Sequence, residues 1–181
     1  GRLAYIGSGD TTDRTIELSG SSTAGWGTLN HEGTGPLVIS NVTFAAGAKR
    51  LYLIGNSTYP ATIISDLVDS GSGNTELVKQ NNGTWILSGD NTYSGQTTLS
   101  EGGYGTLTYT GSNTLGGAFA IENGILRLPA GAYMSSTNNF GIRRGGAFHL
   151  DGGTFIRNTR TGDGETFSIG HSAGGYGHLS V

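Results

Sequence analysis

The chain has 181 residues, including 34 glycines, three prolines and no cysteine, and its formal net charge is −3. Only 13% of the residues are charged, so the chain lacks the basic excess with which nucleic-acid-binding proteins neutralise phosphates. The absence of cysteine excludes a disulfide scaffold and a cysteine-based zinc site, and no apolar run approaches the roughly 18 residues of a membrane-spanning helix.

Short apolar segments bounded by Gly, Ser or Asn recur along the chain and predict β-strands. In chain order they are residues 16–18, 37–39, 51–54, 63–64, 85–87, 107–109, 126–128, 148–150 and 167–169. Residues 105–111 alternate most clearly, with Leu107 and Tyr109 on one face and three threonines on the other. Glycine interrupts every candidate helix. We therefore expect an all-β chain.

The strand segments recur with a spacing of about 20 residues, a length typical of one coil of a β-solenoid. At this spacing Leu18 is followed by Ile39, and Leu87 is followed in turn by Leu107, Leu128, Leu150 and Ile169. In such a fold, neighbouring coils bury the inner face of each coil. We predict one parallel β-solenoid over residues 1–181, with eight or nine coils stacked about 4.8 Å apart.

Residues 77–102 read LVKQNNGTWILSGDNTYSGQTTLSEG. This segment closely resembles the autotransporter-associated β-strand repeat of large secreted bacterial proteins and is the best-matching repeat of the chain; residues 14–18 and 169–177 are similar to other pieces of those proteins. Leu99 departs from the usual valine, and residues 101–105 lengthen one corner. The resemblance implies a right-handed parallel β-helix, exported by a Gram-negative bacterium to the cell surface or the medium, with flanking repeats of the same chain as its neighbours.

Neither end of the chain shows a signal peptide or a polar cap over the terminal coil. We expect residues 1–181 to be a segment of a longer repetitive protein. The alternative is that the open ends stack head to tail into a filament, which requires a matching twist as well as open strand edges.

The sequence contains no recognised motif for a nucleophile, a metal or a nucleotide, so we predict no catalytic residue, metal or cofactor. A polysaccharide-cleaving β-helix enzyme is the alternative, and it needs two carboxylates about 5–9 Å apart. Asp66 with Asp69, and Asp151 with Asp163 and Glu165, are the candidates. Their Gly- and Thr-rich surroundings are equally typical of turns.

Lysine, arginine and histidine residues give weaker evidence for a catalytic or metal site than the carboxylates do. Lys79 or Arg157 would be the base of a lyase, although nothing in their spacing favours them. The separation of His149 and His171 in the sequence is close to the length of one coil, so we predict that they lie on adjacent coils. Two histidines without a third ligand make a poor metal site, and surface or ladder histidines are the preferred interpretation.

Aromatic side chains offer a second means of binding a sugar, since flat rings stack on pyranose faces. The candidate glycan or partner contacts are Trp26, Tyr93, Tyr104 and Tyr176. Trp85 lies within a predicted strand, where core packing explains it more readily. Tyr93 and Tyr176 belong to corner motifs, which favour packing beneath a turn.

Charge is distributed unevenly along the sequence. Residues 61–126 are acidic, and residues 127–160 hold five arginines against Asp151. Because sequence order is axial order in a solenoid, an acidic stretch should precede a basic one. The candidate contacts for an anionic polysaccharide or a neighbouring rod are Arg143, Arg144, Arg157 and Arg160; the alternative is ordinary variation on a solvated surface.

These observations predict a non-catalytic, extracellular structural or adhesive β-solenoid module. A self-assembling filament subunit and a polysaccharide-cleaving enzyme are the two alternatives. The expected partners are other repeats or copies of the chain, and a polysaccharide. Nucleic acid and a membrane-spanning segment are not expected.

Overall fold

The computed structural model describes residues 1–20, 25–100, 102–158, 167–170 and 176–181. These residues form nineteen strands in two eight-stranded sheets and one three-stranded sheet. The all-β prediction is confirmed. Within the described ranges there is no helix, and hence none with the length and apolar character needed to cross a membrane.

Each sheet is a stack of parallel strands, one strand from each coil. Sheet A contains β1 (Arg2–Tyr5), β3 (Gly25–His31), β5 (Lys49–Ile54), β7 (Thr75–Lys79), β9 (Thr97–Leu99), β12 (Phe119–Ile121), β15 (Phe140–Ile142) and β18 (Phe167–Ile169). Sheet B contains β2 (Asp10–Leu18), β4 (Leu37–Phe44), β6 (Ala61–Ile63), β8 (Thr84–Leu87), β10 (Thr106–Tyr109), β13 (Ile125–Pro129), β16 (Ala147–Asp151) and β19 (His178–Ser180). Sheet C contains β11 (Ser112–Leu115), β14 (Tyr133–Ser136) and β17 (Thr154–Arg157).

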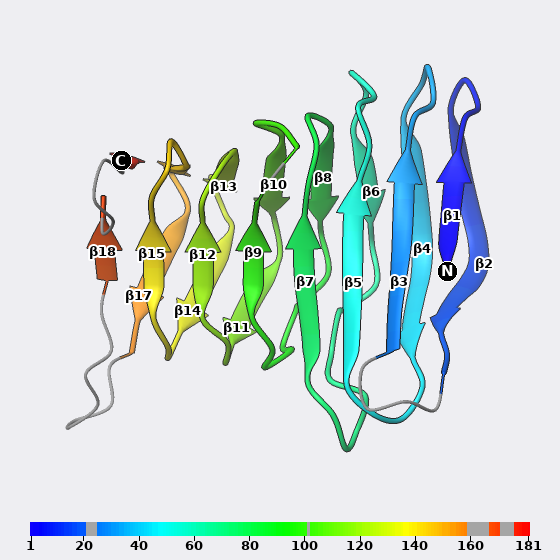
Figure 1. Ribbon diagram of the computed structural model, residues 1–181, viewed down its shortest axis with the longest axis horizontal. Coiled ribbons are helices and arrows are strands. Elements are labelled where there is room, and N and C mark those ends of the chain that lie inside the picture. Colours follow the sequence, from blue (N-terminus) through cyan, green and yellow to red (C-terminus); the bar gives the residue numbers. More distant parts are fainter. Residues whose placement is uncertain (21–24, 101, 159–166, 171–175) are drawn as a thin grey trace.

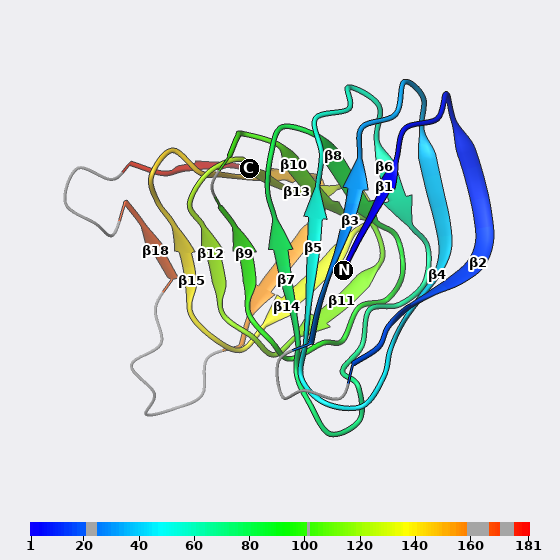
Figure 2. The same ribbon diagram turned by 45° about the vertical axis from the view of Figure 1, so that its right-hand side comes forward.

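The chain winds as a right-handed solenoid. In Figure 1 it rises through sheet A at the front, crosses over the top, returns through sheet B at the back, and moves one strand away from the N-terminus with each circuit. Figure 2 shows sheet C on a third side, beneath the later coils. The parallel β-helix implied by the sequence resemblance is confirmed.

The strand register shows how the coil length varies along the axis. Lys49 pairs with Thr75, whereas Leu77 pairs with Thr97, so the coil that begins at β5 is longer than the one that begins at β7. The predicted spacing of about 20 residues, common in solenoid repeats, thus describes the coils between β7 and β15. The coils before and after them are longer, so the chain makes fewer turns than the eight or nine coils that were predicted.

Of the predicted steps, only the one from Leu128 to Leu150 coincides with a pairing in the structure. Leu107 pairs with Trp85 and Leu126 rather than with Leu87 and Leu128. Leu18 pairs with Phe44 rather than Ile39, and the segment 167–169 lies in sheet A, so it does not continue the series of Leu150 in sheet B.

Equivalent inward side chains stack into ladders along the axis. Phe119, Phe140 and Phe167 occupy paired positions in sheet A, and their ring centroids are 5.1 and 5.3 Å apart. Phe148 and Phe155 pack against Phe140 from sheets B and C. Each coil thus contributes few large apolar residues, and the core acquires its size by repetition.

Buried polar groups form ladders as well. Asn91 accepts a hydrogen bond from the backbone N–H of Leu67 at 2.9 Å and donates to Asn113 Oδ1 at 2.6 Å. Asn113 in turn donates to the carbonyl of Tyr133 at 3.0 Å. Burial of these amides is tolerated because each is hydrogen-bonded.

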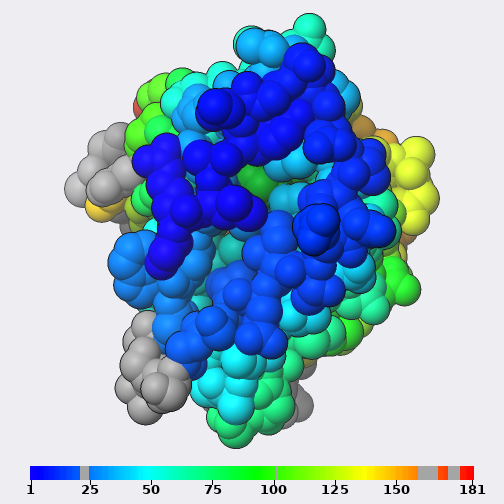
Figure 3. Space-filling view, turned by 90° about the vertical axis from the view of Figure 1, so that its right-hand side faces the viewer, coloured from blue at the N-terminus to red at the C-terminus, as the bar shows by residue number. Residues whose placement is uncertain are grey.

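The interior is partly open at the end formed by β1 and β2. Figure 3 looks along the axis from this end and shows a hollow rimmed by the first coil. A cavity of about 130 Å³ at this end is lined mainly by apolar side chains, among them Tyr5, Ile16, Leu29 and Trp85. Trp85 is buried, as expected for a core residue.

The phenylalanine ladder predicts a graded loss of stability. Phe140→Ala removes a fully buried ring from the middle of the ladder, and we expect the free energy of unfolding to fall by about 3–5 kcal/mol. Phe167→Ala is the matched control, since Phe167 is 39% exposed and its loss should cost clearly less. Urea denaturation followed by circular dichroism measures both, and equal losses would contradict the ladder.

Candidate functional site

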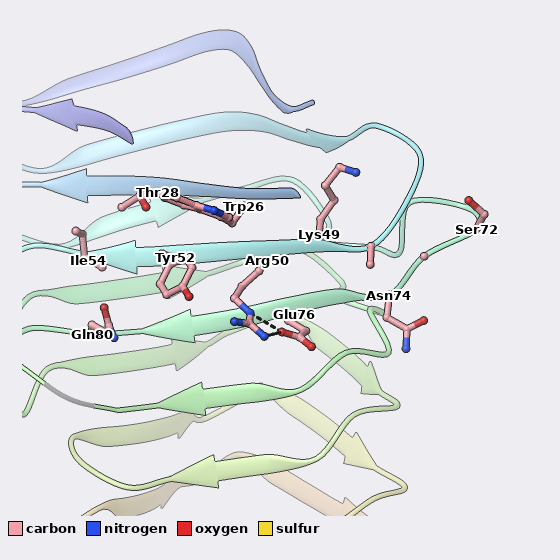
Figure 4. Close-up of a pocket in the computed structure, with 12 residues that line it drawn as sticks. Trp26, Thr28, Lys49, Arg50, Tyr52, Ile54, Ser72, Asn74, Glu76 and Gln80 are labelled. Carbon is pink, nitrogen blue, oxygen red and sulfur yellow. Dashed lines mark hydrogen bonds and ion pairs between the residues drawn. The ribbon is translucent and has the colours of Figure 1, made fainter. Parts of the chain in front are cut away.

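A groove of about 910 Å³ lies on the outer face of sheet A, across β3, β5 and β7 (Figure 4). Side chains alternate between the two faces of a strand, so the residues between the buried leucines point outward into this groove. They include Trp26 and Thr28 from β3, Arg50 and Tyr52 from β5, and Glu76 from β7.

An aromatic pair forms one wall of the groove. Trp26 is 61% exposed, and its ring centroid lies 6.3 Å from that of Tyr52 with the planes at 79°. This edge-to-face contact is a favoured arrangement of aromatic rings. The tyrosine supports the indole, while much of the indole surface remains open to solvent.

An ion pair crosses the neighbouring strands. Arg50 donates to Glu76 Oε2 from Nε, and the two side chains are 49% and 37% exposed. Hydrogen bonds to Tyr52 and Glu76 raise the pKa of Arg50 above its usual value, so the guanidinium stays charged and Glu76 balances it. Lys49 also lines the groove, but its ammonium is buried and donates to the carbonyls of Gly20, Ala46 and Gly47.

The groove continues along the solenoid axis. A further hollow of about 250 Å³ shares Arg50, Tyr52, Glu76 and Gln80 with the first and extends over β7 and β9. Its additional lining residues are Val78, Gln96, Thr98 and Ser100. The outer face of sheet A therefore presents one elongated surface, aromatic at one end and polar at the other.

The residues predicted as contacts are divided between different places. Trp26 lies in the groove. Tyr93 is fully buried, and its Oη is hydrogen-bonded to the hydroxyls of Thr97 and Tyr109. The prediction of Tyr93 as a ligand contact is therefore wrong, because the ring packs inside the solenoid, as its corner motif had favoured.

Four other predicted residues meet at one corner, outside the groove. Tyr104 and Tyr176 are 69% and 76% exposed, and a Cβ placed on Gly145 would lie within 4 Å of both rings. Arg143 and Arg144 precede this glycine and share one carboxylate, with Glu122 oxygens at 3.2 and 3.6 Å. Tyr176 thus lies on the surface and not beneath a turn.

The predicted basic patch is only partly assembled. Arg157 lies on β17 in sheet C, where its Nε donates to the carbonyl of Asn138 at 3.3 Å. Arg127 pairs with Asp151 of the next coil. Arg160 lies outside the described residues. The described arginines of this stretch make contacts within the solenoid, which agrees with ordinary surface variation.

The candidate catalytic carboxylates that are described bind the protein itself. Asp66 accepts the backbone N–H of Asp90 at 2.7 Å, and Asp69 accepts those of Thr75 and Ser94 at 2.8 and 3.0 Å. Asp151 pairs with Arg127. Asp163 and Glu165 lie outside the described residues. These contacts are those of turns and strand connections.

The histidines do not form the predicted pair in the part of the chain that is described. His149 contacts His178, with ring centroids 5.9 Å apart, and His171 lies outside the described residues. The described His, Asp and Glu residues form no cluster of three or more that could hold a metal ion.

Lys79 occupies an inward position of sheet A. It is paired between Leu53 and Leu99 and only 2% exposed. Its Nζ donates to the carbonyls of Gln80 and Asn81 at 2.7 and 3.0 Å, at a corner where Asn81 has a φ of 62°. Burial lowers the pKa of Lys79 to about 8. Because this amine is enclosed by the corner, it is not placed to act as a base on a polysaccharide.

Lys79 predicts a characteristic dependence of stability on pH. Between about pH 8 and pH 10 the unfolded chain holds a proton on this lysine that the folded chain has lost, so the free energy of unfolding should rise with pH, by about 2 kcal/mol. Above pH 10 the trend should reverse, since burial raises the pKa of Tyr93 to about 12 and that of Tyr109 well above its usual value. The folded chain then keeps protons that the unfolded chain loses.

Urea denaturation of the wild type and Lys79→Met at pH 8, 9, 10 and 11 measures this dependence. The variant should lose the rise between pH 8 and pH 10 and keep the fall above it. If the free energy of unfolding changed equally with pH in the two proteins between pH 8 and pH 10, Lys79 would be charged in the folded chain throughout this range.

Sequence reasoning did not single out Arg50, Tyr52 or Glu76. Residues 50–53 alternate between a charged or aromatic side chain and leucine, which assigns Arg50 and Tyr52 to the outer face. The missing information was the register, which brings Glu76 and Trp26 beside Arg50 on adjacent strands.

Comparison with known proteins identifies the repeats. The family described as "Passenger-associated-transport-repeat" matches residues 77–103 and 103–128. The Adhesin BmaC autotransporter of Brucella suis biovar 1 (strain 1330) is 34% identical over 97 residues, which cover 51% of this chain and 3% of the adhesin. No solved structure matches the chain. The sequence resemblance to autotransporter passenger repeats is confirmed.

Proposed function

We propose that this chain, which carries two consecutive passenger-associated-transport-repeats, is a non-catalytic structural and adhesive module of a bacterial protein at or outside the cell surface. The observation that carries the proposal is the uninterrupted parallel stack of sheet A, which presents an elongated outer groove on a repetitive scaffold. Such a solenoid spaces its binding surface along a rod.

The relative supports the adhesive part of the proposal. It is named an adhesin and an autotransporter, and it aligns with half of this chain. Because the aligned segment is 3% of that protein, adhesion by this segment is our inference. Residues 1–181 would be one β-solenoid section of a much longer repetitive chain, whose neighbouring sections continue the stack.

Those groups of the enzyme alternative that lie in the described part of the chain make contacts within the protein. Asp66 and Asp69 bind backbone amides, and Lys79 is enclosed by a corner. The groove on sheet A instead has an exposed indole and a paired arginine and glutamate, which suit binding without bond cleavage. We therefore favour recognition over catalysis.

Surface display tests the adhesive function. A bacterium without adhesins of its own would carry residues 1–181 on its surface, and we expect several-fold greater retention on cultured epithelial cells or extracellular matrix than for the same strain displaying an unrelated β-solenoid. The strain that displays the unrelated β-solenoid controls for any retention caused only by a bulky protein on the cell surface. Equal retention on every surface would leave a spacer function only and contradict adhesion.

Sedimentation of the purified chain tests the filament alternative. A single sedimentation coefficient over a wide concentration range is expected for a module that acts within its own chain. Particles that lengthen with concentration, seen also by electron microscopy, would replace the proposed function with filament assembly.

A further inference from the structure

We propose that the groove on the outer face of sheet A binds an uncharged glycan chain that lies along the solenoid axis, with Trp26 as its stacking platform. This inference rests on the proposed adhesive function and names its ligand class. Three features of the groove carry it: the exposed indole, the balanced charge and the axial direction.

The exposed indole is the first feature. The chain buries Trp85 almost completely, whereas Trp26 is 61% exposed. Tyr52 contacts Trp26 edge to face, which orients the indole without covering both of its faces. A large flat apolar surface that is held in place and left open suits the C–H face of a pyranose ring, which packs against aromatic rings.

The balanced charge is the second feature. Arg50 and Glu76 neutralise each other across β5 and β7, and the ammonium of Lys49 is directed to three backbone carbonyls. The groove therefore has no unpaired cation among its described lining residues to hold a sulfate or uronate. Thr28, Asn74 and Gln80 add neutral donors and acceptors, which are suited to sugar hydroxyls.

The axial direction is the third feature. Trp26, Arg50 and Glu76 occupy paired positions on three successive strands, so they form a row parallel to the axis, as Figure 4 shows. Adjacent strands are about 4.8 Å apart, which is close to the length of one sugar residue. A glycan along this row would meet one new side chain per residue and continue over Gln96, which follows Glu76 in the row and lines the second hollow.

Protection of Trp26 from acrylamide quenching tests the inference with the whole chain. Buried Trp85 is shielded already, so changes in quenching report on Trp26. The probes are oligomers of β-1,4-linked glucose, β-1,4-linked N-acetylglucosamine and α-1,4-linked glucose, with heparin hexasaccharide and oligogalacturonate as anionic ligands. We expect at least one neutral oligomer to protect Trp26, with affinity that increases with oligomer length, and no protection by the anionic ligands at physiological salt.

Variants locate the binding site. Trp26→Ala should weaken calorimetric binding of the protecting oligomer by about tenfold or more, and Arg50→Met with Glu76→Gln should weaken it without adding charge. Tyr104→Ala is the matched control, because it removes an equally exposed aromatic ring outside the groove and should leave binding unchanged. Circular dichroism verifies that each variant is folded.

Three results would overturn the inference: protection by anionic ligands with strong salt dependence, protection by none of the oligomers, or unchanged binding in Trp26→Ala. Its failure is distinguishable from that of the proposed function. If displayed Trp26→Ala cells adhere as well as wild-type cells, the adhesive function stands and the glycan site does not. If neutral oligomers bind but displayed cells adhere to nothing, the glycan site stands and adhesion of this segment is refuted.

Discussion

Parallel pairing of each strand with its counterpart one coil later is the constraint on which the whole structure depends. It places equivalent residues of successive coils directly above one another, so that any side chain allowed at a position must tolerate a neighbour about 4.8 Å away. Phenylalanine satisfies this by stacking, and asparagine by hydrogen bonding along the row. On the outer face of sheet A, the same pairing of successive coils places Trp26, Arg50 and Glu76 in one row.

The fold was largely predictable because its signals are local. Short alternating segments and frequent glycine indicated strands and corners, and each of the nine predicted segments overlaps a strand of the structure. The pairing register between strands of successive coils was harder to predict from the sequence. Leu87 is paired with Tyr109 rather than Leu107, since corners of different length shift the alignment by a few residues. Strands such as Thr97–Leu99, with one large apolar residue each, give little signal without their neighbours.

The candidate site was predictable only in part, for the same reason. Trp26 is conspicuous in the sequence, but its partner Tyr52 lies in the next coil and belongs to a segment recognised for its buried leucines. Residue type alone does not predict exposure: Tyr93 is a candidate contact by its sequence, but its hydroxyl is bonded to Thr97 and Tyr109 inside the solenoid. The arginines formed a stretch in sequence, yet corner and sheet positions separate Arg144 from Arg157.

The two buried amines have a consequence for the surface chemistry of the chain. Lys49 and Lys79 are the lysines of the sequence, and each is 2% exposed with its ammonium bonded to carbonyls. The native chain therefore offers no readily accessible lysine to acylating reagents or lysine-specific proteases, and the basic side chains on its described surface are arginines. In the unfolded chain both lysines are open to attack, and each becomes protected when the coil that holds it folds. Lysine acylation thus distinguishes wound from unwound coils at two places along the rod.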